Sequence, residues 1–529
     1  MDRRPQQKGI EMNRVNVLRR GCVLLFAGTA LPALSATPCA ALKDFRMAGQ
    51  AVQIDSAQPV AAGPMTGGPP GPAGPRANLP AYCKVDGTID KRTGRNGKPY
   101  AIGFSVALPD EWNGRFLFQG GGGLNGAVNP PLGAQFSGEK PALAQGFAVV
   151  STDSGHKGSN FDDTFLEDQE AALNFLYNAV GKVTVVAKEI VTQRYGKSAE
   201  RSYFVGCSTG GREAMIVSQR YPDYFDGIVA GAPAMRTGYS NLGLRWATTS
   251  LNAIAPKDAK GVPQTRDALS DADRKLVSDG MLAACDALDG AKDGLMFAAP
   301  SCKFDPAVLA CKGAKTASCL SKAQVNAVKK VMAGPKASDG RQVYPGYLWD
   351  TGITNTRGGL PGVLVGPPIP EGPTTATSMN VDAEAARAHD ARGMVGDSNA
   401  WTNLSTFQGR GGKLMFFHGV SDAWFSSLDT IQYYERLAAD NAATPLANWS
   451  RLFLVPGMGH CNGGERTTDR FNMLEPLVSW VEKGMAPDRI IATGASVPGE
   501  SRPLCPYPAH AHYNGTGDAK DAASYSCRQ

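Results

Sequence analysis

The chain has 529 residues, of which 42% are hydrophobic. A chain of this size can bury a large core, and we expect more than one domain or one domain with a large insertion. The formal net charge of +6 falls to +2 beyond residues 1–36, where 48 basic residues face 46 acidic ones, which excludes an electrostatic case for binding nucleic acid or an anionic membrane.

Residues 1–36 have the pattern of a secretory signal peptide. Basic residues precede an apolar run at 22–34, and small residues up to Ala36 provide a cleavage site. Translation from Met12 instead of Met1 would keep every feature that a signal needs. The run is too short for a membrane span, and no other stretch is long and apolar enough. We therefore expect a secreted or periplasmic protein with no membrane span.

The remaining chain alternates strands with helices on either side of one long interruption. Residues 37–100 are rich in Ala, Pro and Gly and predict an irregular surface segment with short strands. The predicted strands are 100–108, 115–119, 146–152, 202–205, 227–232, 413–418 and 451–455. The predicted helices are 163–195, 211–220, 428–440 and 471–483. This rhythm predicts a mainly parallel sheet with helices on both faces.

Between residues 235 and 400 the rhythm stops. This part contains clustered cysteines and many Gly and Pro breaks, and we interpret it as an inserted domain. The core is then built from two parts of the chain, residues 37–234 and residues 401–529.

One turn in the first part of the core has a chemical signature. Gly206-Cys207-Ser208-Thr209-Gly210 fits G-x-S-x-G, the nucleophile elbow in which a serine projects from a tight strand–helix turn. Five residues are a weak pattern in a chain with 62 glycines, and the alternative is an ordinary glycine-rich turn.

The order of later residues supports the elbow. Asp422 follows the strand at 413–418, and His460 follows the strand at 451–455, which gives the order serine, acid, histidine. His460 would act as the general base toward Ser208, and Asp422 would orient the imidazole. The alternative is a structural loop histidine and a turn aspartate.

An oxyanion needs two backbone N–H donors. Thr209 would supply one from the start of the helix after the nucleophile, and the loop after the strand at 115–119 would supply the other. Gly121 or Gly122 is our candidate in that loop; the alternative is a flexible surface loop.

Ten cysteines remain beyond the signal segment, an even number that in an exported chain predicts five disulfides whose pairing is open. Cys207 precedes Ser208 and Cys461 follows His460, so a triad would bring these two cysteines close enough to bridge. The competing interpretation makes Cys207 a thiol nucleophile.

An acidic stretch in the inserted part predicts a cation site. Asp286, Asp289 and Asp293 supply three closely spaced carboxylates, and the backbone carbonyls of Ala291 and Leu295 could complete an oxygen shell for Ca²⁺. The alternative is a solvated acidic turn.

Taken together, these motifs resemble the tannase/feruloyl esterase family, which includes a relative that hydrolyses mono(2-hydroxyethyl) terephthalate. The resemblance covers nearly the whole chain after the signal segment and rests on Cys207-Ser208, Asp422 and His460-Cys461, together with Gly120–Gly123, 151–156, 206–212 and 502–507. It implies an α/β-hydrolase core with a lid inserted at 235–400, and a structural Ca²⁺ in that lid at Asp286, Asp289, Ala291, Asp293 and Leu295. It also implies the disulfides Cys39–Cys83, Cys207–Cys461, Cys285–Cys302, Cys311–Cys319 and Cys505–Cys527.

The resemblance further implies a serine carboxylesterase acting on small esters of aromatic acids. Feruloyl-type phenolic esters are our first choice, and terephthalate monoesters or galloyl esters are the alternatives. Phe425 is expected to face the site. A terephthalate monoester would need a cation for its free carboxylate, and Arg236, Arg245 and Arg357 are candidates. A more remote hypothesis is a non-catalytic, calcium-stabilised extracellular binding protein; the sequence predicts no oligomeric state.

Overall fold

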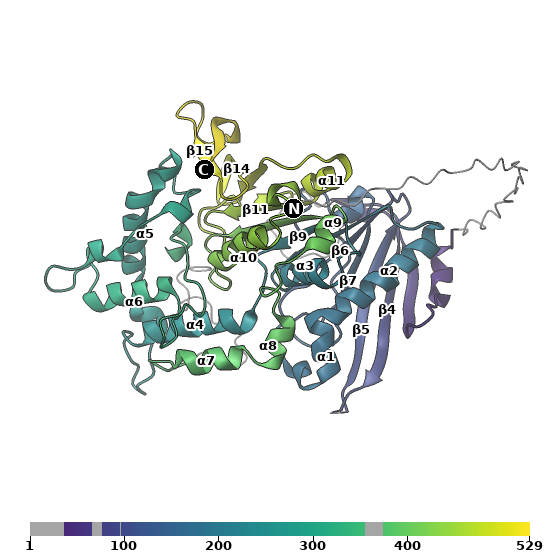
Figure 1. Cartoon of the computed structure of the whole chain (residues 1–529), viewed down its shortest axis with the longest axis horizontal. Coiled ribbons are helices and arrows are strands. Elements are labelled where there is room, and N and C mark those ends of the chain that lie inside the picture. Colours follow the sequence, from purple (N-terminus) through teal and green to yellow (C-terminus); the bar gives the residue numbers. More distant parts are fainter. Residues whose placement is uncertain (1–35, 66–76, 96, 355–373) are drawn as a thin grey trace, which may run out of the picture. The chain divides into compact units, whose positions relative to one another are not determined.

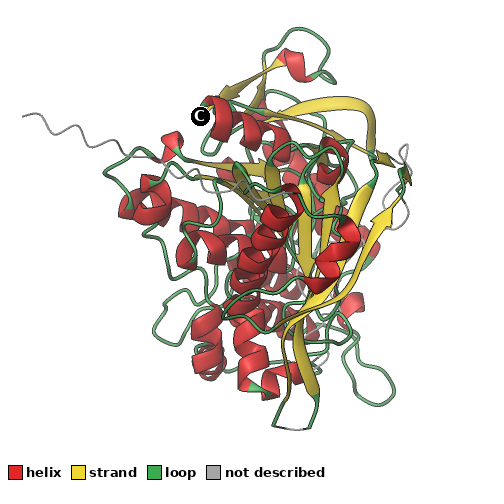
Figure 2. Ribbon diagram, turned by 90° about the vertical axis from the view of Figure 1, so that its right-hand side faces the viewer, coloured by secondary structure: helices red, strands yellow, loops and turns green. Residues whose placement is uncertain are grey.

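The predicted alternation builds one nine-stranded mixed sheet (Figures 1 and 2). The computed structural model describes residues 36–65, 77–95, 97–354 and 374–529. The strands follow the order β1-β4-β5-β7-β6-β8-β9-β10-β11. Neighbours from β7 to β11 pair in parallel, whereas β1, β4, β5 and β7 pair antiparallel. The strands are β1 (Val52–Val60), β4 (Tyr82–Thr93), β5 (Pro99–Pro109), β6 (Arg115–Gln119), β7 (Ala148–Thr152), β8 (Arg201–Cys207), β9 (Gly227–Gly231), β10 (Lys413–Gly419) and β11 (Ser450–Val455).

Helices cover both faces of this sheet, which explains why its central strands are continuous apolar runs. In β6, Phe116 and Phe118 belong to one buried cluster, whereas Leu117 between them belongs to another. Phe416 and Phe417 of β10 divide in the same way, because successive side chains of a strand point to opposite faces. The first cluster includes α2 (Ala179–Tyr195), α3 (Thr209–Arg220) and α10 (Ser427–Asp440), and the second includes α11 (Leu474–Lys483).

The helix predicted at 163–195 begins later and contains one wide turn. It consists of α1 (Gln169–Leu173), a π-helical turn over Asn174–Asn178, and α2. The guanidinium of Arg212 in α3 donates to the carbonyl oxygens of Phe175 and Leu176 in this turn, at 3.1 and 2.8 Å. Such turns interrupt the regular helical hydrogen bonds, so the buried Arg212 binds carbonyls that the helix does not fully use.

The prediction for residues 37–100 was wrong in one respect. This part contains two long strands, β1 and β4, which extend the sheet beyond β5. In β4, Cys83, Val85, Gly87 and Ile89 are buried, while the residues that alternate with them are partly exposed. This alternation marks a half-buried antiparallel strand, and the Pro- and Gly-rich composition of the surrounding segment obscured it.

The segment between β9 and β10 is mainly helical, in teal and green in Figure 1. It leaves the sheet at Gly231 and returns at Lys413, and these two strands are parallel neighbours. Its helices are α4 (Thr237–Asn252), α5 (Asp271–Cys285), α6 (Lys322–Ala333), α7 (Val381–Ala388), α8 (Ala391–Gly396) and α9 (Ser405–Gly409). Residues Ser35–Gln529 form one compact unit, and the division into a core and an inserted lid at 235–400 stays a prediction.

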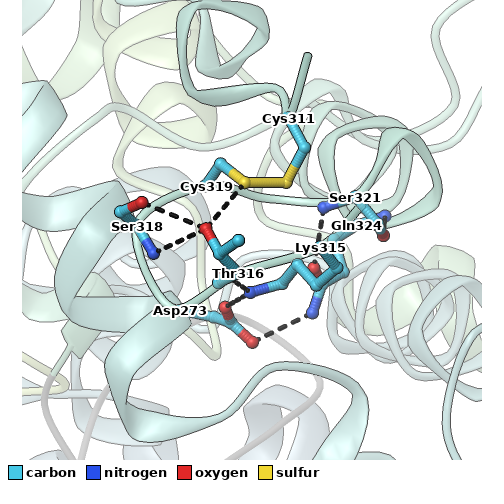
Figure 3. Close-up of a disulfide and its surroundings, with 8 residues drawn as sticks. All are labelled: Asp273, Cys311, Lys315, Thr316, Ser318, Cys319, Ser321 and Gln324. Atoms are coloured by element: carbon cyan, nitrogen blue, oxygen red, sulfur yellow. Dashed lines mark hydrogen bonds and ion pairs between the residues drawn. A yellow bond between two sulfur atoms is a disulfide. The ribbon is translucent and has the colours of Figure 1, made fainter. Parts of the chain in front are cut away.

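A short disulfide loop joins the beginnings of α5 and α6 (Figure 3). Cys311 and Cys319 close it with a sequence separation of 8. Lys315 in the loop donates to Asp273 Oδ1 at 2.7 Å, and Gln324 donates to Asp273 Oδ2 at 2.9 Å. Asp273 and Gln324 also complete the capping boxes of α5 and α6, so one hydrogen-bonded cluster fixes two helix starts.

The chain closes with small antiparallel sheets. Their strands are β12 (Arg470–Phe471), β13 (Ile490–Gly494) and β14 (Val497–Leu504), and the pair β15 (His510–Tyr513) and β16 (Tyr525–Arg528); near the beginning, β2 (Gly63–Pro64) pairs with β3 (Asn78–Leu79). Within the described parts of the chain, no helix is long and apolar enough to cross a membrane. The predicted signal segment, apart from Ala36, lies outside the described residues.

Five disulfides are present, in the same pairs that the resemblance to the family implied. They are Cys39–Cys83, Cys207–Cys461, Cys285–Cys302, Cys311–Cys319 and Cys505–Cys527.

Candidate active site

The sequence Gly206–Gly210 forms a tight strand–helix turn with Ser208 at its tip. β8 ends at Cys207, α3 begins at Thr209, and Ser208 has φ 65° and ψ −122°. Residues other than glycine rarely adopt this backbone conformation. Here the Ser208 N–H donates to the carbonyl of Gly231 at 3.0 Å. A Cβ on Gly206 would lie 2.5 Å from the carbonyl oxygen of Gly210. The turn therefore needs glycine where strand and helix meet, and it leaves the serine projecting.

Ser208, His460 and Asp422 form a chain of hydrogen bonds. His460 Nε2 lies 2.8 Å from Ser208 Oγ, and His460 Nδ1 lies 2.7 Å from Asp422 Oδ2. Asp422 is buried, and the side chain of His460 is 18% exposed. This arrangement can withdraw a proton from the serine hydroxyl and stabilise the imidazolium that results.

A second histidine, which the sequence reasoning missed, also contacts Asp422. His418 at the end of β10 is fully buried, and its Nε2 lies 2.9 Å from the carbonyl of Phe425 and 3.3 Å from Asp422 Oδ2. A carbonyl only accepts, so Nε2 carries the proton and faces both oxygens. Burial alone would raise the pKa of Asp422, but the charge of His460 and hydrogen bonds from both histidines lower it below its usual range. The carboxylate therefore stays ionised beneath His460.

The Cys207–Cys461 disulfide lies directly beside these residues. Its Cα atoms are 6.1 Å apart, and it links positions separated by 254 residues. Cys461 Sγ is 3.8 Å from His460 Nε2. The bridge fastens the turn that carries the serine to the loop that carries the histidine, and it leaves Cys207 without a free thiol.

The two glycine candidates for the oxyanion site differ. The N–H of Gly121 donates to Glu213 Oε2 at 2.9 Å, so this N–H is already engaged within the protein. A Cβ on Gly122 would meet nothing within 4 Å. Among the described residues, neither Gly122 N–H nor Thr209 N–H has a hydrogen-bond acceptor. Of the predicted donors, Thr209 and Gly122 are the ones available to a bound oxyanion.

A buried aspartate from the segment between β9 and β10 ties the loop of Asp422 to the loop of His460, and no sequence pattern indicated it. Asp350 Oδ2 accepts from Ser421 Oγ and from the N–H of Gly457, both at 2.7 Å. Ser421 in turn accepts from the N–H of Gly352 at 2.9 Å. Burial raises the pKa of Asp350 to about 6. Ser421 adjoins Asp422, and Gly457 lies in the turn that leads to His460.

Aromatic side chains surround the histidine. The ring centroids of Trp424 and Phe425 lie 5.0 and 5.1 Å from that of His460. Phe161, which is 45% exposed, meets Trp424 edge to face at 6.3 Å. The predicted placement of Phe425 beside the site agrees with this geometry, whereas Trp424 and Phe161 were not predicted. The partly buried rings of Trp424 and Phe425, with the exposed Phe161 against Trp424, offer a surface for an aromatic ring.

Two of the arginines considered for a substrate carboxylate already bind acids. Arg236 Nε donates to Asp429 Oδ2 at 3.1 Å, and Arg245 Nη1 donates to Glu384 Oε2 at 2.8 Å. Arg357, the third, lies outside the described residues.

The predicted calcium loop brings three carboxylates together. Burial raises the pKa of Asp289 to about 7, and the nearby charges of Asp293 and Asp286 act in the same direction. The side chains of Asp286 and Asp289 accept loop N–H groups, and Asp293 Oδ2 binds Arg502 at 2.6 Å. In the described ranges, no three His, Cys, Asp or Glu side chains form a group that could hold a metal ion as they stand. The donor chemistry suits Ca²⁺, because these are oxygen ligands, but a converged ligand set is not preformed.

The mixed sheet, with a serine at the strand–helix turn after β8, has the architecture of the α/β-hydrolase fold class. The sequence matches the family described as "Tannase and feruloyl esterase" over residues 83–365 and 374–528. The chain belongs to this family, and the expected fold class and enzyme class are confirmed.

Individual relatives agree with this assignment. The chain is 40% identical to the mono(2-hydroxyethyl) terephthalate hydrolase of Piscinibacter sakaiensis, with 94% of this chain and 92% of the relative covered. It is 32% identical to a probable feruloyl esterase B-1 of Aspergillus fumigatus, with coverage of 79% and 81%. It superposes on the crystal structure of feruloyl esterase B from Aspergillus oryzae with a TM-score of 0.74 and 27% identity, over 93% of this chain and 99% of the other. The remote hypothesis of a non-catalytic binding protein is therefore set aside.

Proposed function

We propose that this protein is a secreted serine carboxylesterase that hydrolyses esters of aromatic acids through an acyl-enzyme. The observation that carries the proposal is the hydrogen-bonded chain Ser208–His460–Asp422, with distances of 2.8 and 2.7 Å. Each side chain stands at the position that a nucleophile, a base and an orienting acid require.

In the proposed reaction, His460 Nε2 removes the Ser208 proton as the serine oxygen attacks the ester carbonyl. The oxyanion that forms accepts hydrogen bonds from the N–H groups of Thr209 and Gly122. When the tetrahedral intermediate collapses, the imidazolium protonates the leaving alcohol, and the acyl group stays on Ser208. A water molecule then attacks the acyl-enzyme with His460 again as base, which releases the acid and restores the serine.

Feruloyl-type esters are the favoured substrates. The rings of Trp424 and Phe425 beside His460, and that of Phe161 against Trp424, support an aromatic acyl group. Of the three arginine candidates, the two that the structure describes, Arg236 and Arg245, are engaged by acids. Among these two, neither offers an open cation to a substrate carboxylate, which supports a phenolic ring as the first choice. A terephthalate monoester is the second candidate, because a mono(2-hydroxyethyl) terephthalate hydrolase is 40% identical to this chain. A galloyl ester is the third.

A hydrolysis panel tests the proposal. Purified protein is assayed with methyl ferulate, a galloyl ester and mono(2-hydroxyethyl) terephthalate, beside Ser208→Ala and its matched control Ser218→Ala, a buried serine further along α3. We expect the highest kcat/KM for methyl ferulate, a loss of at least about a thousandfold in Ser208→Ala, and full activity in Ser218→Ala. Turnover retained by Ser208→Ala would refute the mechanism, and a preference for the terephthalate ester would reverse the substrate order.

We also propose a structural Ca²⁺ in the inserted segment, held by the carboxylates of Asp286, Asp289 and Asp293 with the carbonyls of Ala291 and Leu295. A bound divalent cation would relieve the repulsion among these carboxylates and hold the loop. Calorimetric titration of chelator-treated protein with Ca²⁺ should give saturable binding that Asp289→Asn abolishes, and chelation should lower the melting temperature. No heat of binding and an unchanged melting temperature would contradict the site.

Export is the last part of the proposal. Five disulfides support folding in an oxidising compartment, and residues 1–36 have the signal pattern described above. Expression of the full chain in a bacterium should yield processed protein outside the cytoplasm, with a new N-terminus near residue 37. A full-length product retained in the cytoplasm would contradict export.

A further inference from the structure

We infer that Glu213 is a positioning residue that holds the glycine loop of the oxyanion site on the helix that follows the nucleophile. This inference rests on the proposed function and assigns a role to a buried carboxylate that the triad does not use. Glu213 lies in the second turn of α3, the helix that begins immediately after Ser208.

The Glu213 carboxylate accepts three hydrogen bonds in a fully enclosed position. It is 2% exposed. Oε2 accepts from the N–H of Gly121 at 2.9 Å, and Oε1 accepts from Ser154 Oγ at 3.0 Å and Asn125 Nδ2 at 3.1 Å. Burial raises the pKa of Glu213, and these donors oppose that rise. Burying a carboxylate lowers the stability of the fold unless hydrogen bonds compensate for the lost hydration. The three donors provide that compensation for Glu213.

The contacts of Gly121 explain what this carboxylate does. On one side, Gly121 N–H donates to Glu213; on the other, Gly121 carbonyl accepts from the N–H of Gly210 at 3.2 Å. Both partners belong to α3. A peptide unit is planar, so fixing the carbonyl of Gly121 also fixes the direction of the N–H of Gly122, which belongs to the same unit. Thr209 N–H is the first N–H of the same helix. The positions of both proposed oxyanion donors are therefore set by contacts with α3.

The neighbouring arginine accounts for only part of the carboxylate's environment, because its positive charge opposes the rise in the pKa of Glu213. Arg212 is buried beside Glu213, but its guanidinium donates to the carbonyls of Phe175 and Leu176. Asn125 and Ser154, in contrast, adopt φ of 54° and 63°, a conformation that is uncommon for residues other than glycine. Two backbone positions are thus held in an unfavourable conformation with their side chains on the carboxylate that also holds Gly121. This pattern indicates that the surrounding structure holds the glycine loop in place through Glu213.

The test is the charge-removing variant Glu213→Gln with methyl ferulate as substrate. A glutamine amide keeps one accepting oxygen and carries an NH2 donor in place of the other. It cannot accept from Gly121 on one side and from both Ser154 and Asn125 on the other, so the contact to Gly121 is weakened. We expect kcat per active site, titrated with a phosphonate inhibitor, to fall about 10- to 100-fold, with KM within about twofold. Phenylboronic acid, which forms a tetrahedral adduct with a serine hydroxyl, should bind correspondingly more weakly, whereas ferulate, the product acid, should bind as before.

Two further variants keep the outcome decisive. Ser218→Ala removes a buried hydroxyl from the same helix that donates to the carbonyl of Met215, so it should lower the melting temperature and leave kcat unchanged. Glu213→Asp keeps the charge but is one methylene shorter; if Glu213→Gln does not fold, the same loss of kcat is expected in Glu213→Asp. Wild-type kcat per active site in a folded Glu213 variant would overturn the inference, as would a loss confined to the number of active sites. If the wild-type protein hydrolyses no ester, it is the proposed function that fails.

Discussion

The two sides of the candidate active site are supported in different ways. On the serine side, Ser208 and the glycine loop are held by β8, β9 and α3, which are parts of the central sheet and its covering helices. On the histidine side, the loops of Asp422 and His460 are held by Asp350, from the segment between β9 and β10, and by the Cys207–Cys461 bridge. Ser208 is therefore fixed by the core, whereas His460 and Asp422 depend on distant parts of the chain.

Each side nevertheless uses one buried carboxylate to accept a loop N–H. Glu213 binds Gly121, and Asp350 binds Gly457. A backbone N–H bound by a carboxylate is a charge-assisted hydrogen bond, which is stronger than one between neutral groups. A buried acid can therefore hold a loop in an active site where no helix or strand provides the hydrogen bonds.

The largest effect is expected from breaking the bridge between the two sides. The double variant Cys207→Ser/Cys461→Ser releases a loop of 254 residues, and removal of a native disulfide typically costs about 2–5 kcal/mol. The melting temperature and kcat should both fall, because Ser208 and His460 adjoin the bridge. The matched control Cys311→Ser/Cys319→Ser opens a loop with a separation of only 8 and should leave kcat unchanged. Equal kcat in both double variants would contradict a role for the bridge in holding the site.

A smaller effect is expected from Asp350→Asn on the histidine side. Weakening the buried contacts to Ser421 and Gly457 should cost about 1–3 kcal/mol and lower kcat. Burial raises the pKa of Asp350 to about 6 from 3.8, so the native state holds this proton more tightly than the unfolded chain. The stability that this group contributes is present below the unfolded pKa and is lost as the pH rises through about 6.

The pH dependence separates this effect from general destabilisation. Melting temperatures of wild type and Asp350→Asn, compared at about pH 4.5 and about pH 7.5, should differ more at the lower pH. Asp153, whose pKa burial also raises to about 6, is present in both proteins and cancels in the difference. A gap that widens at the higher pH would contradict the assignment.

On the serine side, two neighbouring glycines should respond unequally. A Cβ at position 121 would overlap the side-chain amide of Asn125, which Glu213 and Ser154 hold, whereas a Cβ at position 122 meets open space. Gly121→Ala should therefore lower the stability by about 1–3 kcal/mol and reduce kcat. Gly122→Ala should fold as the wild type does and keep its backbone N–H. Similar losses in both variants, measured by melting temperature and by turnover of methyl ferulate, would show that the glycine loop is not fixed as described.

The smallest effect is expected at Phe161, whose ring reaches Trp424 on the histidine side. If these rings bind the aromatic acyl group, Phe161→Ala loses an aromatic contact of about 0.5–1.5 kcal/mol. KM for methyl ferulate should rise severalfold with little change in kcat, and KM for an aliphatic ester should not change. Phe161→Tyr should retain the low KM. An equal rise in KM for both esters would argue against ring recognition.

The residues of the candidate triad could be predicted because local patterns mark them. Five consecutive residues around Ser208 form the recognisable elbow motif. Asp422 and His460 each follow an apolar strand that periodicity identifies. Cys207 and Cys461, which flank Ser208 and His460, narrowed the class of protein to one family. Strands β6 to β11 were predictable for the same reason: they are short buried runs between turn residues.

The supporting residues could not be predicted, because their contacts join distant segments. Glu213 and Gly121 are separated by 92 residues, and Asp350 and Gly457 by 107. Nothing local distinguishes such an acid from one on the surface. His418 is different: it lies four residues before Asp422 at the end of a buried strand, a spacing that could have indicated a contact. The choice between Gly121 and Gly122 likewise required the position of Glu213.

The segment that supplies Asp350 begins and ends at adjacent, parallel strands of the sheet. Its length can change without altering the register of β9 against β10, because both anchor points are fixed by hydrogen bonds within the core. It can therefore be treated as an exchangeable cassette, open to grafting from other members of the family. A grafted segment must keep a carboxylate at the place of Asp350. Without it, the loops that carry Asp422 and His460 would lose their contacts to this segment, whatever new substrate contacts the graft supplied.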